Sequence, residues 1–267
     1  MLFRSRFLEL NRAGYQTQFL LARGANLLLS ALVGVCLWLW GRNLGGELCG
    51  LIAAGLWLCC PVCLSNAAVA TPDVGATLLF LATLWSAWRL AREPQWRTAL
   101  VVGLLLGGAQ LAKFTNILLW AFIPWVWLAV RWREGVPRVA LSRLTGLVLT
   151  VILAALVVWN AGYLFQGTGR PLGDWTFRSQ SLQRLQQGLS GWQRVPVPLP
   201  TDYLAGFDRQ RATMEGSHPV YLDGVWNLEG FPAYYLYCAA YKWPHGTQLW
   251  ILLGLAVWLG EIGRAHV

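Results

Sequence analysis

Apolar segments long enough to cross a lipid bilayer constrain this chain more than any other feature. A transmembrane helix needs about 20 mostly apolar residues because the hydrocarbon core is about 30 Å thick. In lipid each span must satisfy its own backbone hydrogen bonds, which favours helices. The sequence therefore predicts an all-α polytopic membrane protein with about seven transmembrane helices, at residues 24–41, 48–70, 74–90, 98–114, 117–130, 144–165 and 246–260.

Composition supports a membrane protein. The chain is 56% hydrophobic and only 12% charged, whereas soluble domains have about 25% charged residues. The net charge of +9 would favour nucleic acid in a soluble protein. Here many arginines lie in short loops between apolar spans, where positive charge sets orientation. We therefore expect no nucleic-acid partner.

The spans divide the chain into five parts. Residues 1–22 mix apolar side chains with Arg and Glu and are expected to lie in the membrane interface. Residues 23–165 form a bundle of six spans, and residues 166–245 form a polar segment of about 80 residues. Residues 246–260 are a truncated seventh span. Residues 261–267 match one translated frame of a common sequencing adapter, so we expect the natural protein to continue differently.

Positive charge predicts the orientation of the spans. Arg42, the turn 89–97 and the loop 131–143 fall on one side when the spans are counted, and this side is cytoplasmic by the positive-inside rule. Residues 166–245 then lie on the outer face of an inner or plasma membrane. Only Thr115 and Asn116 separate the fourth and fifth spans. If these two spans form one element, the predicted membrane orientation of every later segment is reversed.

An acid and a base stand at the ends of two consecutive spans. Thr71-Pro72-Asp73 has the pattern of a helix start, with Thr as N-cap and an acid in the first turn. Asp73 is also a candidate general base or cation ligand. Lys113 closes the fourth span and either extends to the headgroups or contacts a phosphate, with Thr115 and Asn116 as further donors. Span counting places Asp73 and Lys113 on the outer face.

Aromatic residues precede the last span. Tyr234 and Tyr235 belong to a run from Phe231 to Pro244 that fits either an interfacial aromatic belt or a stacking platform for a sugar or lipid chain. The motif Cys59-Cys60-Pro61-Val62-Cys63 fits buried apolar thiols, because no second ligand cluster has zinc spacing. We expect no metal site and no disulfide.

The stretch from Leu58 to Leu119 resembles the GT-C class of integral-membrane glycosyltransferases. More narrowly it is similar to the branch of dolichyl-phosphate-mannose–protein mannosyltransferases and aminoarabinose transferases. Its Gly-rich span reads Gly107-Gly-Ala-Gln-Leu-Ala-Lys113 against the family pattern Gly-Leu-Ala-x-Leu-(Thr/Ser)-Lys, from which Gly108 and Ala112 depart. The likeness covers roughly residues 20–255 in architecture and is most specific over 65–119.

The resemblance implies a function on the outer face. Such enzymes transfer a hexosyl or pentosyl group from a polyprenyl-phosphate carrier to a lipid or protein acceptor, with inversion. A carboxylate activates the acceptor hydroxyl, and basic residues or a divalent cation stabilise the leaving phosphate. Asp73 matches the acid of the family's second outer loop, and Lys113 matches its lysine; Thr115, Asn116, Tyr234 and Tyr235 are our candidate substrate contacts.

One departure and two alternatives stay open. The family's principal acid, often an Asp-Glu pair, lies in a first outer loop, whereas Glu9 is the only acid before the first span here. We therefore expect an internal fragment, and the activity of these residues alone is left open. A transporter or flippase of lipid-linked sugars would need polar residues at mid-bilayer, where Gln110 and Asn160 are the main candidates. A non-catalytic membrane scaffold is the third hypothesis.

Overall fold

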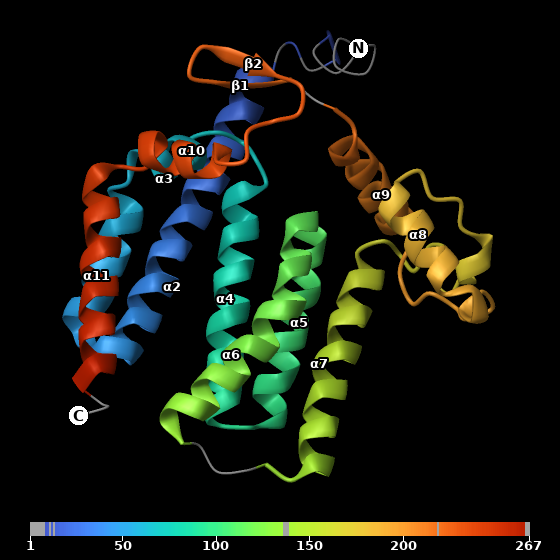
Figure 1. Cartoon of the computed structure of the whole chain (residues 1–267), viewed down its shortest axis with the longest axis horizontal. Coiled ribbons are helices and arrows are strands. Elements are labelled where there is room, and N and C mark those ends of the chain that lie inside the picture. The colour runs from blue at the N-terminus through green and yellow to red at the C-terminus, as the bar shows by residue number, and fades with distance from the viewer. Residues whose placement is uncertain (1–8, 11, 13, 136–138, 218, 265–267) are drawn as a thin grey trace. The chain divides into compact units, whose positions relative to one another are not determined.

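The structure is a computed structural model that describes the backbone of residues 9–10, 12, 14–135, 139–217 and 219–264, and side chains up to Val257 (Figure 1). The described residues are mostly α-helical, with one two-stranded hairpin, so the all-α prediction is confirmed. The chain forms two compact units. Unit 1 comprises the described residues up to Leu78, Tyr221–Val225 and the described residues from Gly230 onward, and unit 2 comprises those of Leu79–Val220 and Trp226–Glu229. The predicted interfacial segment 1–22 and the adapter-like residues 261–267 lie partly outside the described residues.

Among the residues that the structure describes, four helices are long and apolar enough to cross a membrane: Tyr15–Leu58, Asp73–Arg92, Phe114–Glu134 and Leu141–Ala161. Two shorter apolar helices, Trp96–Ala112 and His245–Val257, fall where the fourth and seventh spans are predicted. Large hydrophobic side chains on these helices are exposed, for example Leu128, Leu153 and Val157. Outward-facing apolar side chains on helices of this length suit contact with lipid. The chain is a membrane protein.

Helix α2 (Tyr15–Leu58) contains the first predicted span and the start of the second as two arms. Gly45 and Gly46 have non-helical backbone angles, and Gly46 has φ of 83°, which favours glycine. The two arms fold back on each other. The Trp57 Nε1 on the second arm donates to the Ser30 carbonyl on the first at 3.1 Å. The predicted turn at Gly45–Gly46 is therefore a helical hairpin, and α3 (Pro61–Ala67) follows it.

Helices α4 (Asp73–Arg92), α5 (Trp96–Ala112), α6 (Leu119–Glu134) and α7 (Leu141–Ala161) correspond to the third to sixth predicted spans. Lys113 is extended, and the 3₁₀ helix η1 (Phe114–Leu118) follows it, so α5 and α6 are separate helices. The two arginine-rich loops meet at one end, where Arg143 donates to the Pro94 carbonyl at 2.8 Å.

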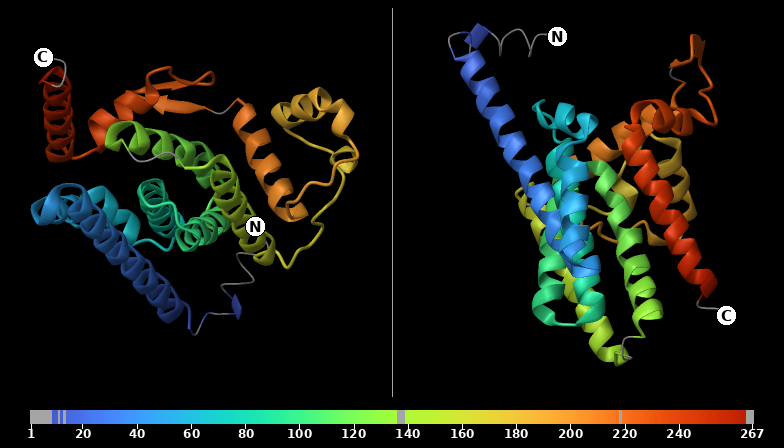
Figure 2. Two further views of the ribbon diagram at one scale, coloured as in Figure 1. Left: turned by 90° about the horizontal axis from the view of Figure 1, so that it is seen from below. Right: turned by 90° about the vertical axis from the view of Figure 1, so that its left-hand side faces the viewer.

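Close packing of α5 against α7 forms the centre of the second unit (Figures 1 and 2). A Cβ atom on Gly103 would lie 2.6 Å from the Ala154 Cβ, and one on Gly107 would lie 2.7 Å from the Val158 Cβ. Buried Leu106, Leu147 and other apolar residues fill the interface. The glycines let the two backbones approach, as small residues do in membrane helix pairs.

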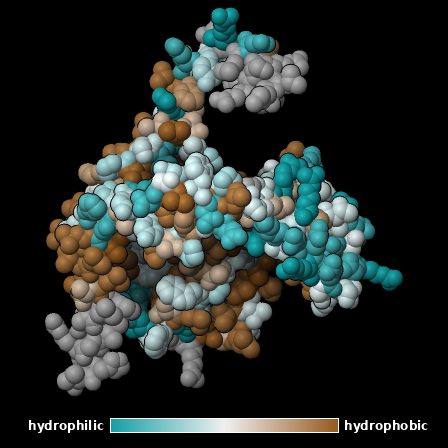
Figure 3. Space-filling view, turned by 45° about the horizontal axis from the view of Figure 1, so that its top comes forward, coloured by the Kyte–Doolittle hydropathy of each residue, from teal (hydrophilic) through white to brown (hydrophobic). Residues whose placement is uncertain are grey.

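The polar segment after α7 has short helices: η2 (Leu172–Asp174), α8 (Gln180–Gly188), η3 (Ser190–Trp192) and α9 (Thr201–Glu215). Hydrophilic residues gather over α8 and α9 in the space-filling view (Figure 3). Strands β1 (Val220–Leu222) and β2 (Val225–Asn227) form the hairpin, followed by α10 (Tyr234–Lys242) and α11 (His245–Arg264). An amphipathic, polar α8 explains why sequence reasoning places no span here.

Candidate functional site

Asp73 lies in the first turn of α4 and is half-buried. Exposed helix N–H groups and the helix dipole favour a negative charge at this position. The helix starts at Asp73, and the buried Thr71 hydroxyl has no hydrogen-bond partner among the described residues, so the predicted Thr71 side-chain cap does not form. Asp73 is thus where the sequence predicts it, at the helix start, although Thr71 does not cap that start.

The segment leading to Asp73 is held by a residue that sequence reasoning missed. The side-chain amide of buried Asn26, on the first arm of α2, donates to the carbonyls of Asn66, Ala67 and Val69 at 3.2, 3.3 and 2.6 Å. Asn66 and Ala67 are the last residues of α3 and Val69 follows them, so the Asn26 amide holds the end of this helix; the Asn66 and Val69 carbonyls also accept from the N–H groups of Val69 and Thr71. A single Asn inside an apolar span was the available signal, but its partners follow only from the tertiary structure.

Lys113 is exposed in an extended residue between α5 and η1. Its N–H donates to the Ala109 carbonyl at 3.3 Å, and its carbonyl accepts from the Asn116 N–H at 3.1 Å. Thr115 is exposed as well. The break between the two helices therefore presents an amine and a hydroxyl within three residues, a pair suited to phosphate oxygens.

Asn116 differs from its neighbours because it is buried, with 4% of its surface exposed. Its side-chain amide donates to the Ala109 carbonyl at 2.9 Å, and its carbonyl accepts from the Gln110 amide at 3.0 Å. These bonds fix the chain reversal between α5 and α6. The Asn116 amide thus shapes the backbone that carries Lys113 and Thr115.

Aromatic rings anchor the polar segment to this chain reversal. The Tyr203 ring of α9 lies edge-on to Phe114 at 5.0 Å and to Trp159 at 4.5 Å between ring centroids. Tyr203 is 2% exposed, and burial raises the pKa of its hydroxyl. Within unit 2, α9 therefore lies at the helix ends opposite the arginine-rich loops.

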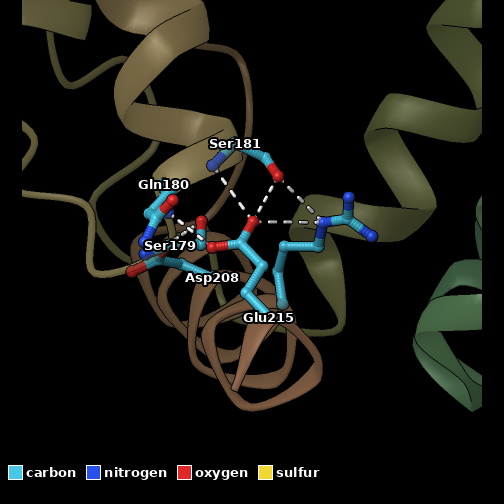
Figure 4. Close-up of polar contacts among 6 residues, drawn as sticks. Ser179, Gln180, Ser181, Asp208 and Glu215 are labelled. Carbon is cyan, nitrogen blue, oxygen red and sulfur yellow. Dashed lines mark hydrogen bonds and ion pairs between the residues drawn. The ribbon is translucent and has the colours of Figure 1, made fainter. Parts of the chain in front are cut away.

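Two acids of α9 cap α8 (Figure 4). The Asp208 carboxylate accepts from the N–H groups of Arg178 and Ser179 at 2.7 and 2.9 Å, and from the Ser179 hydroxyl at 2.7 Å. Glu215 accepts from the N–H groups of Gln180 and Ser181 and from the Ser181 hydroxyl. Hydrogen bonds, that of the Ser181 hydroxyl first, hold the pKa of Glu215 below its usual value. Sequence reasoning found no diagnostic spacing here, although the acids lie seven residues apart, on one helix face.

Tyr234 and Tyr235 lie side by side in the first turn of α10, with ring centroids 5.5 Å apart. Tyr234 lines a cavity, whereas the Tyr235 side chain is 83% exposed and is not among the cavity residues. The two tyrosines, which the sequence groups together, therefore differ in their surroundings: Tyr234 faces the cavity and Tyr235 does not. Asp73, Lys113 and the tyrosines come from different parts of the chain, and each is described in its own surroundings.

The described His, Cys, Asp and Glu side chains do not gather into a metal site of their own. No group of three or more His, Cys, Asp or Glu side chains gathers around a common point in the part of the chain that the structure describes. Asp73 is half-buried in α4, and Asp208 and Glu215 are occupied by N–H and hydroxyl donors. The described acids thus supply no cation site built from three or more protein side chains.

Comparison with known proteins gives one family. The sequence model of the family described as dolichyl-phosphate-mannose-protein mannosyltransferase matches residues 16–159, more than half of the chain. Neither a curated protein nor a solved structure matches the chain. The matched residues include Asp73, Lys113, Thr115 and Asn116 and end before the polar segment begins.

Proposed function

Because the chain belongs to the dolichyl-phosphate-mannose-protein mannosyltransferase family, a family of membrane glycosyltransferases, we propose that it transfers a sugar from a polyprenyl-phosphate carrier to a lipid or protein acceptor. The observation that carries the proposal is the family match across α2 to α7, within which Asp73 and Lys113 lie at helix ends. The proposed setting is the outer face of a multi-pass protein of the inner or plasma membrane.

The proposed chemistry is transfer with inversion at the anomeric carbon. The carboxylate of Asp73 accepts the proton of the acceptor hydroxyl, whose oxygen forms the new bond to the anomeric carbon. The bond from that carbon to the phosphate oxygen breaks, and the phosphate leaves with the electron pair. The Lys113 ammonium and the Thr115 hydroxyl stabilise the charge on this phosphate.

Asn116 has a positioning role in this proposal. Its side-chain amide holds the turn between α5 and α6 through the Ala109 carbonyl, so it fixes the backbone on which Lys113 and Thr115 stand. The proposed steps assign no role to a divalent cation.

The transporter alternative gains no support from its two polar candidates. Gln110 lies in the last turn of α5 and donates to the Asn116 carbonyl, and Asn160 lies at the end of α7 and donates to the carbonyls of Leu156 and Pro198. Both amides therefore serve backbone carbonyls near helix ends, whereas a substrate pathway needs polar groups at mid-bilayer.

The test is Asp73→Asn in the full-length protein, with Asp202→Asn as a matched control. Asp202 is an exposed acid at the start of α9. Transfer of radiolabelled sugar from a polyprenyl-phosphate donor in membranes is expected to fall at least 100-fold in Asp73→Asn, a typical contribution of general-base catalysis, and to persist in Asp202→Asn. Wild-type turnover in a correctly folded Asp73→Asn protein ends the proposal.

A further inference from the structure

A cavity of about 230 Å³ lies between the hairpin turn and α10, within unit 1. Tyr221 and Asp223 line it from the hairpin, and Tyr234, Tyr237, Tyr241 and Lys242 line it from α10. The volume is smaller than the roughly 300–1,000 Å³ of pockets for drug-sized ligands. The cavity therefore suits a ligand of the size of one sugar ring.

Helical spacing builds the aromatic wall of this cavity. Tyr234, Tyr237 and Tyr241 stand at positions i, i+3 and i+7 of α10, which lie on one helix face. The rings of Tyr237 and Tyr241 are nearly parallel, at 16° with centroids 6.5 Å apart. Leu236 falls on another face and is 75% exposed. The wall is thus a run of flat apolar surfaces edged by hydroxyl groups.

The hairpin turn places a carboxylate in the same cavity. Asp223 and Gly224 form the two-residue turn between β1 and β2, both with positive φ, 49° and 84°, as the tight hairpin turns require. Asp223 lines the cavity together with Lys242, so an acid and a base share its edge. This balance favours a neutral ligand with many hydroxyls over an anion, which the carboxylate repels, or a hydrocarbon chain, which would desolvate both charges.

We propose that this cavity binds a single pyranose ring. The C–H face of the sugar packs on the tyrosine rings, and its hydroxyls donate to Asp223 and accept from Lys242 and the tyrosine hydroxyls. The inference rests on the proposed function in one respect, that the bound ring belongs to the donor or acceptor of the transfer reaction. Tyr234 then acts in substrate binding, and Tyr235 is dispensable for it.

Binding can be measured without any transfer reaction. Saturation-transfer NMR on the full chain in detergent micelles uses methyl α-mannopyranoside, methyl β-glucopyranoside and methyl β-arabinopyranoside as probes. At least one glycoside is expected to bind the wild-type chain, and Asp223→Asn and Tyr237→Ala are expected to weaken it at least tenfold. Leu236→Ala, a change on the outer side of the same helix, is expected to leave binding within twofold. Inorganic phosphate and farnesol are expected not to displace the sugar.

Several results overturn the inference. These are the absence of glycoside binding in the wild-type chain, equal binding in Asp223→Asn, and displacement by phosphate or farnesol. Asp223→Asn leaves all the tyrosine rings in place, and asparagine tolerates the positive φ of this turn, so the inference stays testable if Tyr237→Ala does not fold. If sugar transfer survives Asp73→Asn, the proposed function is wrong and the cavity inference stands. If the cavity variants bind glycosides as tightly as wild type, the cavity inference is wrong and the proposed function stands.

Discussion

Asp208 shows how single residues hold the polar segment together. Burial alone would raise the pKa of its carboxyl, but the N–H groups of Arg178 and Ser179, the Ser179 hydroxyl and the Arg178 charge outweigh it and hold the pKa below the usual value. A carboxyl with a lower pKa in the folded state stabilises that state above its unfolded pKa of about 3.9. This contribution is lost as pH falls through the folded pKa.

The cap therefore predicts a pH-dependent effect of Asp208→Asn. At pH 7 we expect hydrogen exchange of the Arg178 and Ser179 amides, which donate to Asp208, to be roughly 5- to 30-fold faster in Asp208→Asn than in wild type. The reason is that hydrogen bonds to a charged group are worth about 1.5–3 kcal/mol and the new side-chain amide retains part of them. Below about pH 4 the two rates are expected to converge. The same change at Asp202, exposed on the same helix, is the control. A ratio that does not change with pH contradicts the predicted role.

At the scale of helices, the approach of α5 and α7 depends on two glycines. Gly103 and Gly107 face backbone and side-chain atoms of α7 at distances that leave no room for a Cβ. Gly108, the next residue, faces away, and a Cβ there would lie 3.8 Å from the Leu79 Cδ2. Small residues in membrane helices favour close helix packing, and the structure shows which of these three glycines create it.

Because Gly103 lacks room for a Cβ whereas Gly108 has it, alanine substitutions at these two positions form a matched pair. Gly103→Ala is expected to lower the free energy of unfolding by about 1–3 kcal/mol, the usual cost of overpacking an interface. Gly108→Ala is expected to be neutral or slightly stabilising, since alanine favours a helix over glycine by up to about 1 kcal/mol. Thermal unfolding in detergent measures both. Equal effects of the two changes would mean that the α5–α7 contact is looser than described.

For the whole molecule, hydropathy predicts the helices well because lipid admits few alternatives to them. The spans from 74 to 165 fall on α4 to α7 within a few residues. The hairpin within α2 is less predictable, because Gly45 and Gly46 mark a break without fixing the angle of the arms. At the candidate site, Asp73 and Lys113 lie at helix ends as predicted. The roles of Asn26 and Asp208 could not be predicted, because their partners lie 29 or more residues away and meet them only after folding.

The orientation of the molecule in the membrane stays a prediction, with a direct measurement. In a cysteine-free background, Gln187→Cys in α8 is expected to react with a membrane-impermeant maleimide added to intact cells. Gln95→Cys, in the turn between α4 and α5, is expected to react only after the cells are opened. Both side chains are exposed, so access to the reagent and not burial decides the result. The opposite pattern would place the polar segment in the cytoplasm and end the outer-face proposal.

The hydrogen bonds from the Asn26 amide also affect the order in which parts of the chain can fold during synthesis. Asn26 precedes its three carbonyl partners by 40 to 43 residues, so during synthesis the donor enters the membrane before the acceptors leave the ribosome. The end of α3 can then find its partner as soon as it is inserted, before α5, α7 or the polar segment exist. The turn that precedes Asp73 can in this way form before the later helices assemble.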